Sequence, residues 1–307
     1  QELTTRMNED NRFAPLRDCV EVTTLNSWGF RRIKGATTSP KLITSKQDFH
    51  FAMMNQLQPV WQKYDRVKHA IEQKSNTTPR KLMDAMDMLK SLGFDHVRQT
   101  NYEQFAERLE SLRGQGLEPM LEDPINRLTK LEVFETKSTK RGDESPRAGD
   151  REFYNSFFRF WREATALLIS NRTFTLEDQK YFAYLDEREK LEDGKFLSGA
   201  AKIDHLLIDE FQDINPLDLA LIKAIAERNK ATITIVGDDD QAIFEWRGAT
   251  PEYILNPDRF FGTSFATHTL ARNYRSPRNI VTRSQDLIKH NKRRVDKNVE
   301  AVRSDDA

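Results

Sequence analysis

Short apolar runs near the two ends of the chain predict buried β-strands. His205–Ile208 and Ala231–Val236 consist mainly of aliphatic and β-branched residues and stop at charged ones. Cys19–Leu25 and Thr267–Leu270 are weaker candidates of the same kind. Because near-continuous apolar strands are typical of a parallel sheet covered on both faces, the sequence predicts an α/β fold.

A helix is predicted between the two stronger strands. Asn215 can cap it, Pro216 can occupy its first turn, and Leu217, Leu221 and Ile225 recur at the spacing of one buried face. Strand, helix and strand in this order form the crossover unit of parallel sheets. The polar residues after the strands then lie at the sheet edge where ligands bind.

The middle third of the chain has the apolar spacing of helices. Asn101 and Thr175 are expected to cap two of them, and residues 137–151 to form an exposed loop. An aromatic face at residues 153–168 is expected to pack in the core, with partner binding as the alternative. The residues expected to face the core are Val60, Tyr64, Val67, Ile71, Leu82, Met86, Leu89, Leu92, Phe105, Leu109, Leu112, Phe153, Phe157, Phe160, Trp161, Ala164 and Leu168.

The composition narrows the class of protein. Lysine and arginine together number 48, as do aspartate and glutamate, so the net charge is zero and any nucleic-acid site must be a local patch. The single cysteine, Cys19, excludes a disulfide framework within the chain and fits the reducing cytoplasm. No segment approaches the roughly 20 apolar residues of a membrane span.

Two adjacent carboxylates follow the first strong strand. Asp209 could hold Mg²⁺ with waters and phosphate oxygens, and Glu210 could polarise a water for attack on a phosphate. An ordinary acidic loop at a strand end is the alternative.

A second polar segment, Gly237–Ala249, follows the second strong strand. Gln241 and three acids face the predicted ligand edge, while Phe244, Trp246 and Arg247 place two aromatic rings beside a cation. Such rings can stack on the bases of a single strand; for aromatic residues taken alone, a place in the core is the favoured alternative.

The third segment, Leu270–Pro277, is expected between a strand and a helix that Ser276 caps and Pro277 starts. Arg275 could reach a phosphate with its planar donors, and Tyr274 could stack on a purine; a surface arginine and a packing tyrosine are the alternative. After this helix, Lys289, Lys292, Arg293 and Arg294 form a basic cluster that is either a solvated helix end or a set of phosphate contacts.

Together these segments resemble three motifs of the UvrD/Rep/PcrA-like family of superfamily 1 helicases. Asp209–Asp213 (Asp-Glu-Phe-Gln-Asp) and Asn273–Ser276 match two motifs in full. Gly237–Ala249 matches the motif between them except that Ala242 and Phe244 replace the usual Ser and Tyr.

Two upstream segments also resemble this family. Thr24–Trp28 is similar to its Thr-Phe-His-Ser-Phe segment, with Leu25 and Asn26 in place of Phe and His. Gln1–Met7 resembles the end of the helix after the family's first DNA-contacting strand.

The resemblance implies ATP and Mg²⁺ as cofactors. It assigns Mg²⁺ binding to Asp209, water activation to Glu210, γ-phosphate sensing to Gln241, adenine stacking to Tyr274 and a γ-phosphate contact to Arg275. It further implies single-stranded DNA and single-strand–duplex junctions as partners. The residues implied to contact DNA are Thr24, Asn26, Ser27, Phe244, Trp246 and Arg247.

The phosphate-binding loop Gly-x-x-x-x-Gly-Lys-Ser/Thr is not found in the sequence. At the one Gly-Lys pair, Gly194-Lys195, Glu189 stands where the first glycine belongs and Phe196 where Ser or Thr belongs. We therefore expect a fragment truncated at both ends, inactive alone.

The resemblance implies a P-loop NTPase, RecA-like parallel sheet with a large helical insertion. Residues 1–34 and 196–266 are expected to form most of the first motor domain, 35–195 the helical insertion, and 267–307 the start of a second motor domain. The expected activity is that of a cytoplasmic, ATP-dependent DNA helicase, moving 3′ to 5′ by resemblance and of a kind used in DNA repair. A helicase–nuclease subunit of the RecB/AddA branch and a non-catalytic DNA-binding remnant remain as alternatives.

Overall fold

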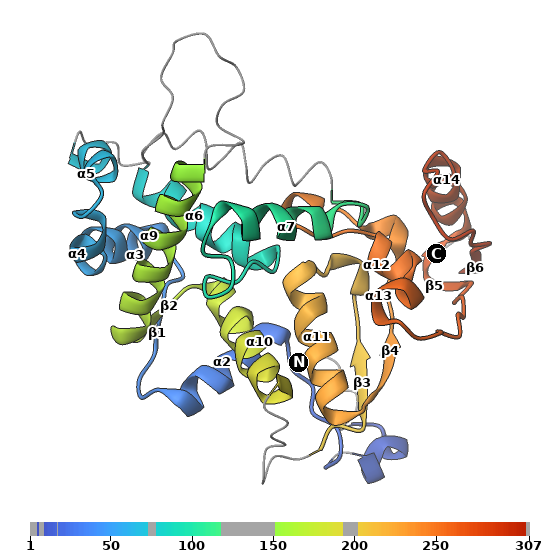
Figure 1. The fold of residues 1–307 in the computed structure, drawn as a ribbon. Coiled ribbons are helices and arrows are strands. Elements are labelled where there is room, and N and C mark those ends of the chain that lie inside the picture. The colour runs from blue at the N-terminus through green and yellow to red at the C-terminus, as the bar shows by residue number, and fades with distance from the viewer. Residues whose placement is uncertain are drawn as a thin grey trace.

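The computed structural model describes residues 5, 9–16, 18–72, 78–117, 151–192 and 202–304. Nearly all of Gln1–Met7, residues 137–150 of the expected loop, and the Gly194-Lys195 pair lie outside these residues. Figure 1 shows a helical region packed against a small parallel sheet, with a second small parallel sheet near the C-terminus. Within the described residues, no helix combines the length and the apolar character needed to cross a bilayer.

The central sheet has the predicted topology. β3 (His205–Ile208) pairs in parallel with β4 (Thr232–Ile235), with His205 opposite Thr232 and Ile208 opposite Ile235. The helix α11 (Pro216–Asn229) connects them, as the sequence predicts.

The start of α11 is fixed by a reciprocal cap. The side chain of Asn215 accepts a hydrogen bond from the backbone N–H of Asp218 at 2.9 Å, and the Asp218 carboxylate accepts one from the N–H of Asn215 at 3.2 Å. Leu217, Leu221 and Ile225 are buried, which confirms the predicted inner face.

The described residues cover one face of this sheet, not the two that were predicted. Side chains along a strand alternate between faces. Ile208 and Ile235 pack against the core cluster beneath α11, whereas Leu207 is 70% exposed and Val236 is 46% exposed on the opposite face. The prediction of a doubly covered sheet is therefore not met within the part of the chain that the structure describes.

The middle of the chain is helical, as predicted, and holds the largest hydrophobic cluster. The stripe from Val60 to Ile71 belongs to two short helices instead of one, with Tyr64 at the break. Asn101 and Thr175 cap their helices as expected. The elements are α3 (Lys46–Phe51), a π-helical turn (Ala52–Gln56), α4 (Gln58–Trp61), α5 (Asp65–Glu72), α6 (Thr78–Ser91), α7 (Tyr102–Leu112), α9 (Arg151–Ser170), α10 (Leu176–Glu192), and the parallel strands β1 (Lys41–Leu42) and β2 (Thr173–Phe174).

The aromatic face of α9 is core, as expected. Its described aromatic side chains are fully buried: Phe157, Phe160 and Trp161 each have no more than a trace of exposed surface. The side chain of Phe153 lies outside the described residues.

Helix α10 packs against both α2 (Leu25–Ala36) and α11 (Figure 1). A Cβ atom on Gly29 of α2 would lie 2.0 Å from the carbonyl oxygen of Gln179, so only glycine allows this close approach. Glu187 of α10 is fully buried between Arg32 of α2, at 2.9 Å, and Arg228 of α11. These contacts hold the helical region to the central sheet.

The two weaker strand predictions are wrong. Residues 20–24 form no strand, because Thr24 instead caps α2 by accepting a hydrogen bond from Ser27 N–H. Residues 267–270 also form no strand, and Leu270 is 86% exposed. The strand begins two residues later, as β5 (Arg272–Pro277), and pairs in parallel with β6 (Glu300–Arg303).

The third candidate segment is consequently placed differently from the expectation. Asn273–Ser276 lies within β5 and not between a strand and a helix. Helix α14 (Arg278–Ile288) begins after Pro277, and Ser276 does not cap it. The Asn273 side chain instead accepts hydrogen bonds from the N–H groups of Arg275 and Ser276.

Candidate functional site

The adjacent carboxylates Asp209 and Glu210 lie at the C-terminal end of β3, both exposed to solvent. The Glu210 N–H donates to Asp209 Oδ1 at 3.0 Å. Glu210 has a left-handed backbone conformation, with φ of 52°. Non-glycine residues adopt this conformation at a cost of about 1–2 kcal/mol, so the surrounding structure must hold it.

The short 3₁₀ turn Phe211–Asp213 supplies that support. Phe211 is fully buried, and its N–H donates to the carbonyl of Val236 at 2.9 Å, which extends the β3–β4 pairing by one step. Gln212 is 2% exposed, and its Nε2 donates to Glu210 Oε2 at 2.7 Å. Its Oε1 accepts from the N–H of Asp238 at 3.0 Å. The segments that follow β3 and β4 are therefore directly connected.

Gln241 lies in a 3₁₀ turn, Asp239–Gln241, that follows β4. Its Nε2 donates to Asp238 Oδ2 at 2.7 Å, and Asp238 Oδ1 accepts from the N–H of Asp240. Burial alone would raise the pKa of Asp238, but hydrogen bonds from Lys297 and Gln241 outweigh it, and the net shift lowers that pKa. The Gln241 side chain is thus held by a carboxylate that stays charged.

The three carboxylates of Asp238, Asp239 and Asp240, which we call the acidic triplet, lie close enough together to surround a cation. Protein side chains already supply that positive charge. Lys297 Nζ lies 2.5 Å from Asp238 and from Asp239 and 3.1 Å from Asp240, and Arg294 binds Asp240 through two nitrogens. Each carboxylate of the triplet thus has a cationic partner from the chain itself, and the triplet carries no argument for a metal site.

Arg294 belongs to the basic cluster whose role the sequence left open. In the structure, Arg294 pairs with Asp240, Arg293 with Glu252 and Lys289 with Asp286. These three side chains are engaged with carboxylates and are not arranged as a set of phosphate contacts.

The aromatic segment after Gln241 is only partly described. Phe244 is half-buried, and the guanidinium of Arg247, which is exposed, lies 5.9 Å from its ring centre. Trp246 lies in a 3₁₀ turn, Glu245–Arg247, but its side chain is outside the described residues. The structure thus brings Phe244 and Arg247 together.

The upstream candidates lie at the first turn of α2. Thr24 and Ser27 are exposed and Asn26 is half-buried. The hydroxyl of Thr24 donates to that of Ser27 at 3.0 Å and also accepts from the Ser27 N–H, so the Thr24 side chain caps the helix. The structural role of the Thr24 hydroxyl is therefore to fix the start of α2.

Tyr274 and Arg275 lie on β5, in the second small sheet. Tyr274 is 65% exposed, and Arg275 is exposed as well. Arg303 of β6 donates to the carbonyl of Arg275 at 2.7 Å. Across the residues described here, no hydrogen bond or ion pair joins Tyr274 or Arg275 to Asp209, Glu210 or Gln241.

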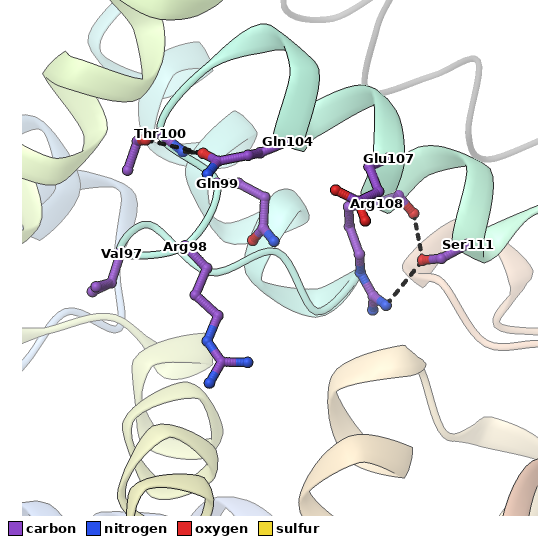
Figure 2. Close-up of a pocket in the computed structure, with 8 residues that line it drawn as sticks. All are labelled: Val97, Arg98, Gln99, Thr100, Gln104, Glu107, Arg108 and Ser111. Carbon is purple, nitrogen blue, oxygen red and sulfur yellow. Dashed lines mark hydrogen bonds between the residues drawn. The ribbon is translucent and has the colours of Figure 1, made fainter. Parts of the chain in front are cut away.

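A hollow of about 550 Å³ lies elsewhere, between α7 and the turn before it (Figure 2). Arg98 and Arg108 line it together with Glu107, and the remaining lining is polar apart from Val97. None of the candidate residues from the sequence lines this hollow, so it gives no support for a nucleotide site there.

The structure therefore brings together Asp209, Glu210 and Gln241 at one sheet edge, because parallel strands end at the same side. An exposed carboxylate such as Asp209, with Oδ2 as a ligand atom, suits Mg²⁺, which keeps several waters when bound. Sequence reasoning named Gln212 within its motif and Arg294 within the basic cluster but did not assign their contacts, and it missed Lys297. The available signals were the position of Gln212 two residues after Glu210 and the charge complementarity between three acids and a distant basic segment.

Comparison with known proteins adds a family match and several relatives. The family described as "UvrD/REP helicase N-terminal domain" matches residues 1–262. A "Probable DNA helicase II homolog" of Mycoplasma capricolum is 35% identical over 43% of this chain and 18% of its own length. A "Putative ATP-dependent DNA helicase YjcD" of Bacillus subtilis is 38% identical over 34% of this chain and 14% of its own length. A "DNA helicase II" of Haemophilus influenzae is 41% identical over 32% of this chain and 13% of its own length. The matched segments thus cover less than a fifth of these relatives.

Proposed function

Because the chain belongs to the UvrD/REP helicase family, we propose that it is part of an ATP-driven DNA helicase that moves along single-stranded DNA. The observation that carries this proposal is the sheet edge at which β3 and β4 deliver Asp209, Glu210 and Gln241 together, linked through Gln212. Relatives named as ATP-dependent DNA helicases support the same activity. Movement from 3′ to 5′ belongs to the proposal and rests on the family resemblance.

Each residue at this edge has a proposed role. Asp209 would hold Mg²⁺, which when bound would supply positive charge to the nucleotide phosphates. Glu210 accepts a proton from the attacking water at a carboxylate oxygen, which a side chain in this position can do only when it is ionised. Gln241 contacts the γ-phosphate with an amide that Asp238 orients.

Tyr274 and Arg275 are proposed to complete the nucleotide site from the second motor domain. Both are exposed, so they are available for a ligand that lies between the two sheets. Tyr274 stacks on the adenine ring, and the planar guanidinium of Arg275 binds the γ-phosphate. Since no hydrogen bond or ion pair joins them to Glu210 among the described residues, the proposal includes an approach of the two sheets when nucleotide binds.

The DNA path is proposed to pass Phe244, Trp246 and Arg247, with Thr24, Asn26 and Ser27 as further contacts. The exposure of Arg247 and the partial exposure of Phe244 support this assignment, since stacking requires an accessible ring. Single-strand–duplex junctions are the proposed physiological substrate.

The proposed domain arrangement follows the same family pattern. Residues 1–34 and 196–266 form the larger part of one RecA-like motor domain, residues 35–195 form a helical insertion, and residues 267–307 begin the second motor domain. We propose that the working enzyme is a longer, cytoplasmic polypeptide that also supplies the phosphate-binding loop. Residues 1–307 alone are expected to bind ATP weakly and to hydrolyse it negligibly, because their sequence contains no such loop.

The test is unwinding by the full helicase polypeptide that contains these residues. A duplex with a 3′ single-stranded tail should be unwound with ATP, and a duplex with a 5′ tail should not. Unwinding from the 5′ tail would contradict the proposed direction. Binding to single strands without any ATP hydrolysis would favour the non-catalytic alternative, and ATP-dependent degradation of the DNA would favour the helicase–nuclease.

A further inference from the structure

We propose that Gln212 is a positioning residue that orients the Glu210 carboxylate for water activation and connects it to the Gln241 turn. This inference rests on the proposed function. Gln212 is 2% exposed, so its amide has no access to water as an alternative partner.

Both polar atoms of the Gln212 amide are used, each on a different segment. Nε2 donates to Glu210 Oε2 at 2.7 Å, and Oε1 accepts from Asp238 N–H at 3.0 Å. Turning the amide over would place a donor against the Asp238 N–H and an acceptor against the carboxylate. The two bonds therefore fix one orientation of the side chain.

The packing around Gln212 leaves it no other position. A Cβ atom on Gly237 would lie 2.4 Å from Gln212 Oε1, so the glycine is what lets the β4 segment pass this close to the amide. Buried Phe211 precedes Gln212 and is bonded to Val236 on the other side. The amide is thus held by the Glu210 side chain on one segment and by the Asp238 backbone on the other.

This arrangement has a consequence for Glu210. Its backbone is in the left-handed region and its carboxylate is exposed, so without Gln212 the carboxylate would sample several rotamers in solvent. The hydrogen bond from a fixed amide selects one of them. Because the same amide binds Asp238, whose Oδ2 accepts from Gln241, a displacement of the Gln241 turn is transmitted to the water-activating carboxylate through two side chains.

The experiment compares variants of the full helicase polypeptide in steady-state ATP hydrolysis with and without single-stranded DNA. Gln212→Met removes both hydrogen bonds at similar volume, and Gln212→Glu keeps an acceptor for Asp238 N–H but loses the donor to Glu210. Both should lower kcat roughly 10–100-fold, the scale that small misplacements of a catalytic group cost, while KM for ATP changes less than about threefold.

Asn215→Ala is the matched control. Asn215 is also buried and also accepts a backbone hydrogen bond, but it caps α11 and does not touch Glu210. It should lower the melting temperature by an amount comparable to Gln212→Met and leave kcat of the folded enzyme within about twofold of wild type.

The possible outcomes distinguish failure of this inference from failure of the proposed function. If the wild type hydrolyses ATP and a folded Gln212→Met or Gln212→Glu enzyme has the same kcat, this inference alone is overturned. Equal kcat losses in Gln212→Met and Asn215→Ala would overturn it as well, because the effect would then follow stability. If Gln212→Met does not fold, the Gln212→Glu enzyme decides by itself. Absence of DNA-stimulated turnover in the wild type would overturn the proposed function, and this inference with it.

Discussion

Arg294 binds the carboxylate of Asp240 through two nitrogens, with Nε 3.0 Å from Oδ1 and Nη2 2.8 Å from Oδ2. The hydrogen bond to Asp240 raises the pKa of Arg294 further above its usual value, so the guanidinium stays charged. Lys297 reaches all three carboxylates of the acidic triplet from the same segment. The turn that carries Gln241 is therefore held by residues that follow α14 in the sequence.

Removal of the Lys297 charge should destabilise the contact between the acidic triplet and the segment that follows α14. Lys297→Met leaves carboxylates that are nearly buried, such as Asp239 at 3% side-chain exposure, without a cation. We expect the free energy of unfolding to fall by roughly 1–3 kcal/mol in chemical denaturation. Lys289→Met is the control, because Lys289 pairs with Asp286 on the open surface and should cost little. Equal effects of the two substitutions would contradict the account.

The buried Lys90 should contribute more to the free energy of unfolding than a lysine on the surface does. It lies between Asp178 of α10, at 2.6 Å, and Asp87 of its own helix, at 2.9 Å. Lys90→Met should cost about 3–5 kcal/mol, because it leaves the buried Asp178 carboxylate and the partly buried Asp87 carboxylate without a cation. Lys68→Met, which removes an exposed pair with Glu72, should cost about 0.5 kcal/mol or less.

A further variant tests the physical reason for the Lys90 effect. Replacing Asp87 and Asp178 by asparagine in the Lys90→Met background should recover much of the lost stability, since no uncompensated charge then remains buried. Failure to recover any stability would mean that the loss came from packing of the lysine stem and not from charge.

Stability should depend on pH through His96. Burial lowers the pKa of His96 to about 4, against the opposing field of Asp95, and its Nδ1 contacts the hydroxyl of Tyr181 at 2.5 Å. Between pH 6.5 and 4 the unfolded chain binds a proton that the folded protein excludes, so the free energy of unfolding falls as pH falls. The difference between wild type and His96→Gln should reach about 2–3 kcal/mol over this range in denaturation curves. A difference that does not change with pH would contradict the assignment.

The salt dependence of single-strand DNA binding distinguishes residues that stack on bases from residues that contact phosphates. In the full helicase polypeptide, Trp246→Ala should weaken single-strand binding by roughly 1–3 kcal/mol at every salt concentration. Arg247→Ala should instead reduce the slope of log affinity against log salt by about 0.7, because one phosphate contact is lost. A Trp246→Ala protein that has a much lower melting temperature, but binds single strands normally at temperatures where it is folded, would show that this ring is part of the core.

Local signals explain which parts of this fold were predictable. Asn215, Pro216 and the apolar run at residues 231–236 lie next to the structure they specify, and so the helix and strand they predict are present. Thr24 shows the limit, because a β-branched run ending in threonine fits both a strand and a helix cap. The cap is the observed outcome because the Ser27 N–H, which has no acceptor within the first turn of the helix, donates to the Thr24 hydroxyl.

Long-range contacts account for what could not be predicted. The pairing of Lys297 with Asp238 spans 59 residues of sequence, and no periodicity encodes it. The motif that contains Glu210 was visible in the sequence, but the second partner of Gln212, the N–H of Asp238, depends on the register of β3 and β4. A sequence pattern can identify the residues of such a site. The hydrogen bonds between them depend on how the two strands pair in the sheet.

The most direct test of the proposed function is DNA-stimulated ATP hydrolysis by the Glu210→Gln variant of the full helicase polypeptide. The amide is similar in shape to the carboxylate but cannot take a proton from water, so Mg²⁺–ATP binding should remain while turnover is lost. Asp209→Asn should weaken metal-dependent nucleotide binding as well, which distinguishes the two carboxylates. The account predicts hydrolysis by Glu210→Gln at least about 100-fold slower than wild type, the lower end of what general-base catalysis contributes at a single group. Hydrolysis at the wild-type rate would contradict it.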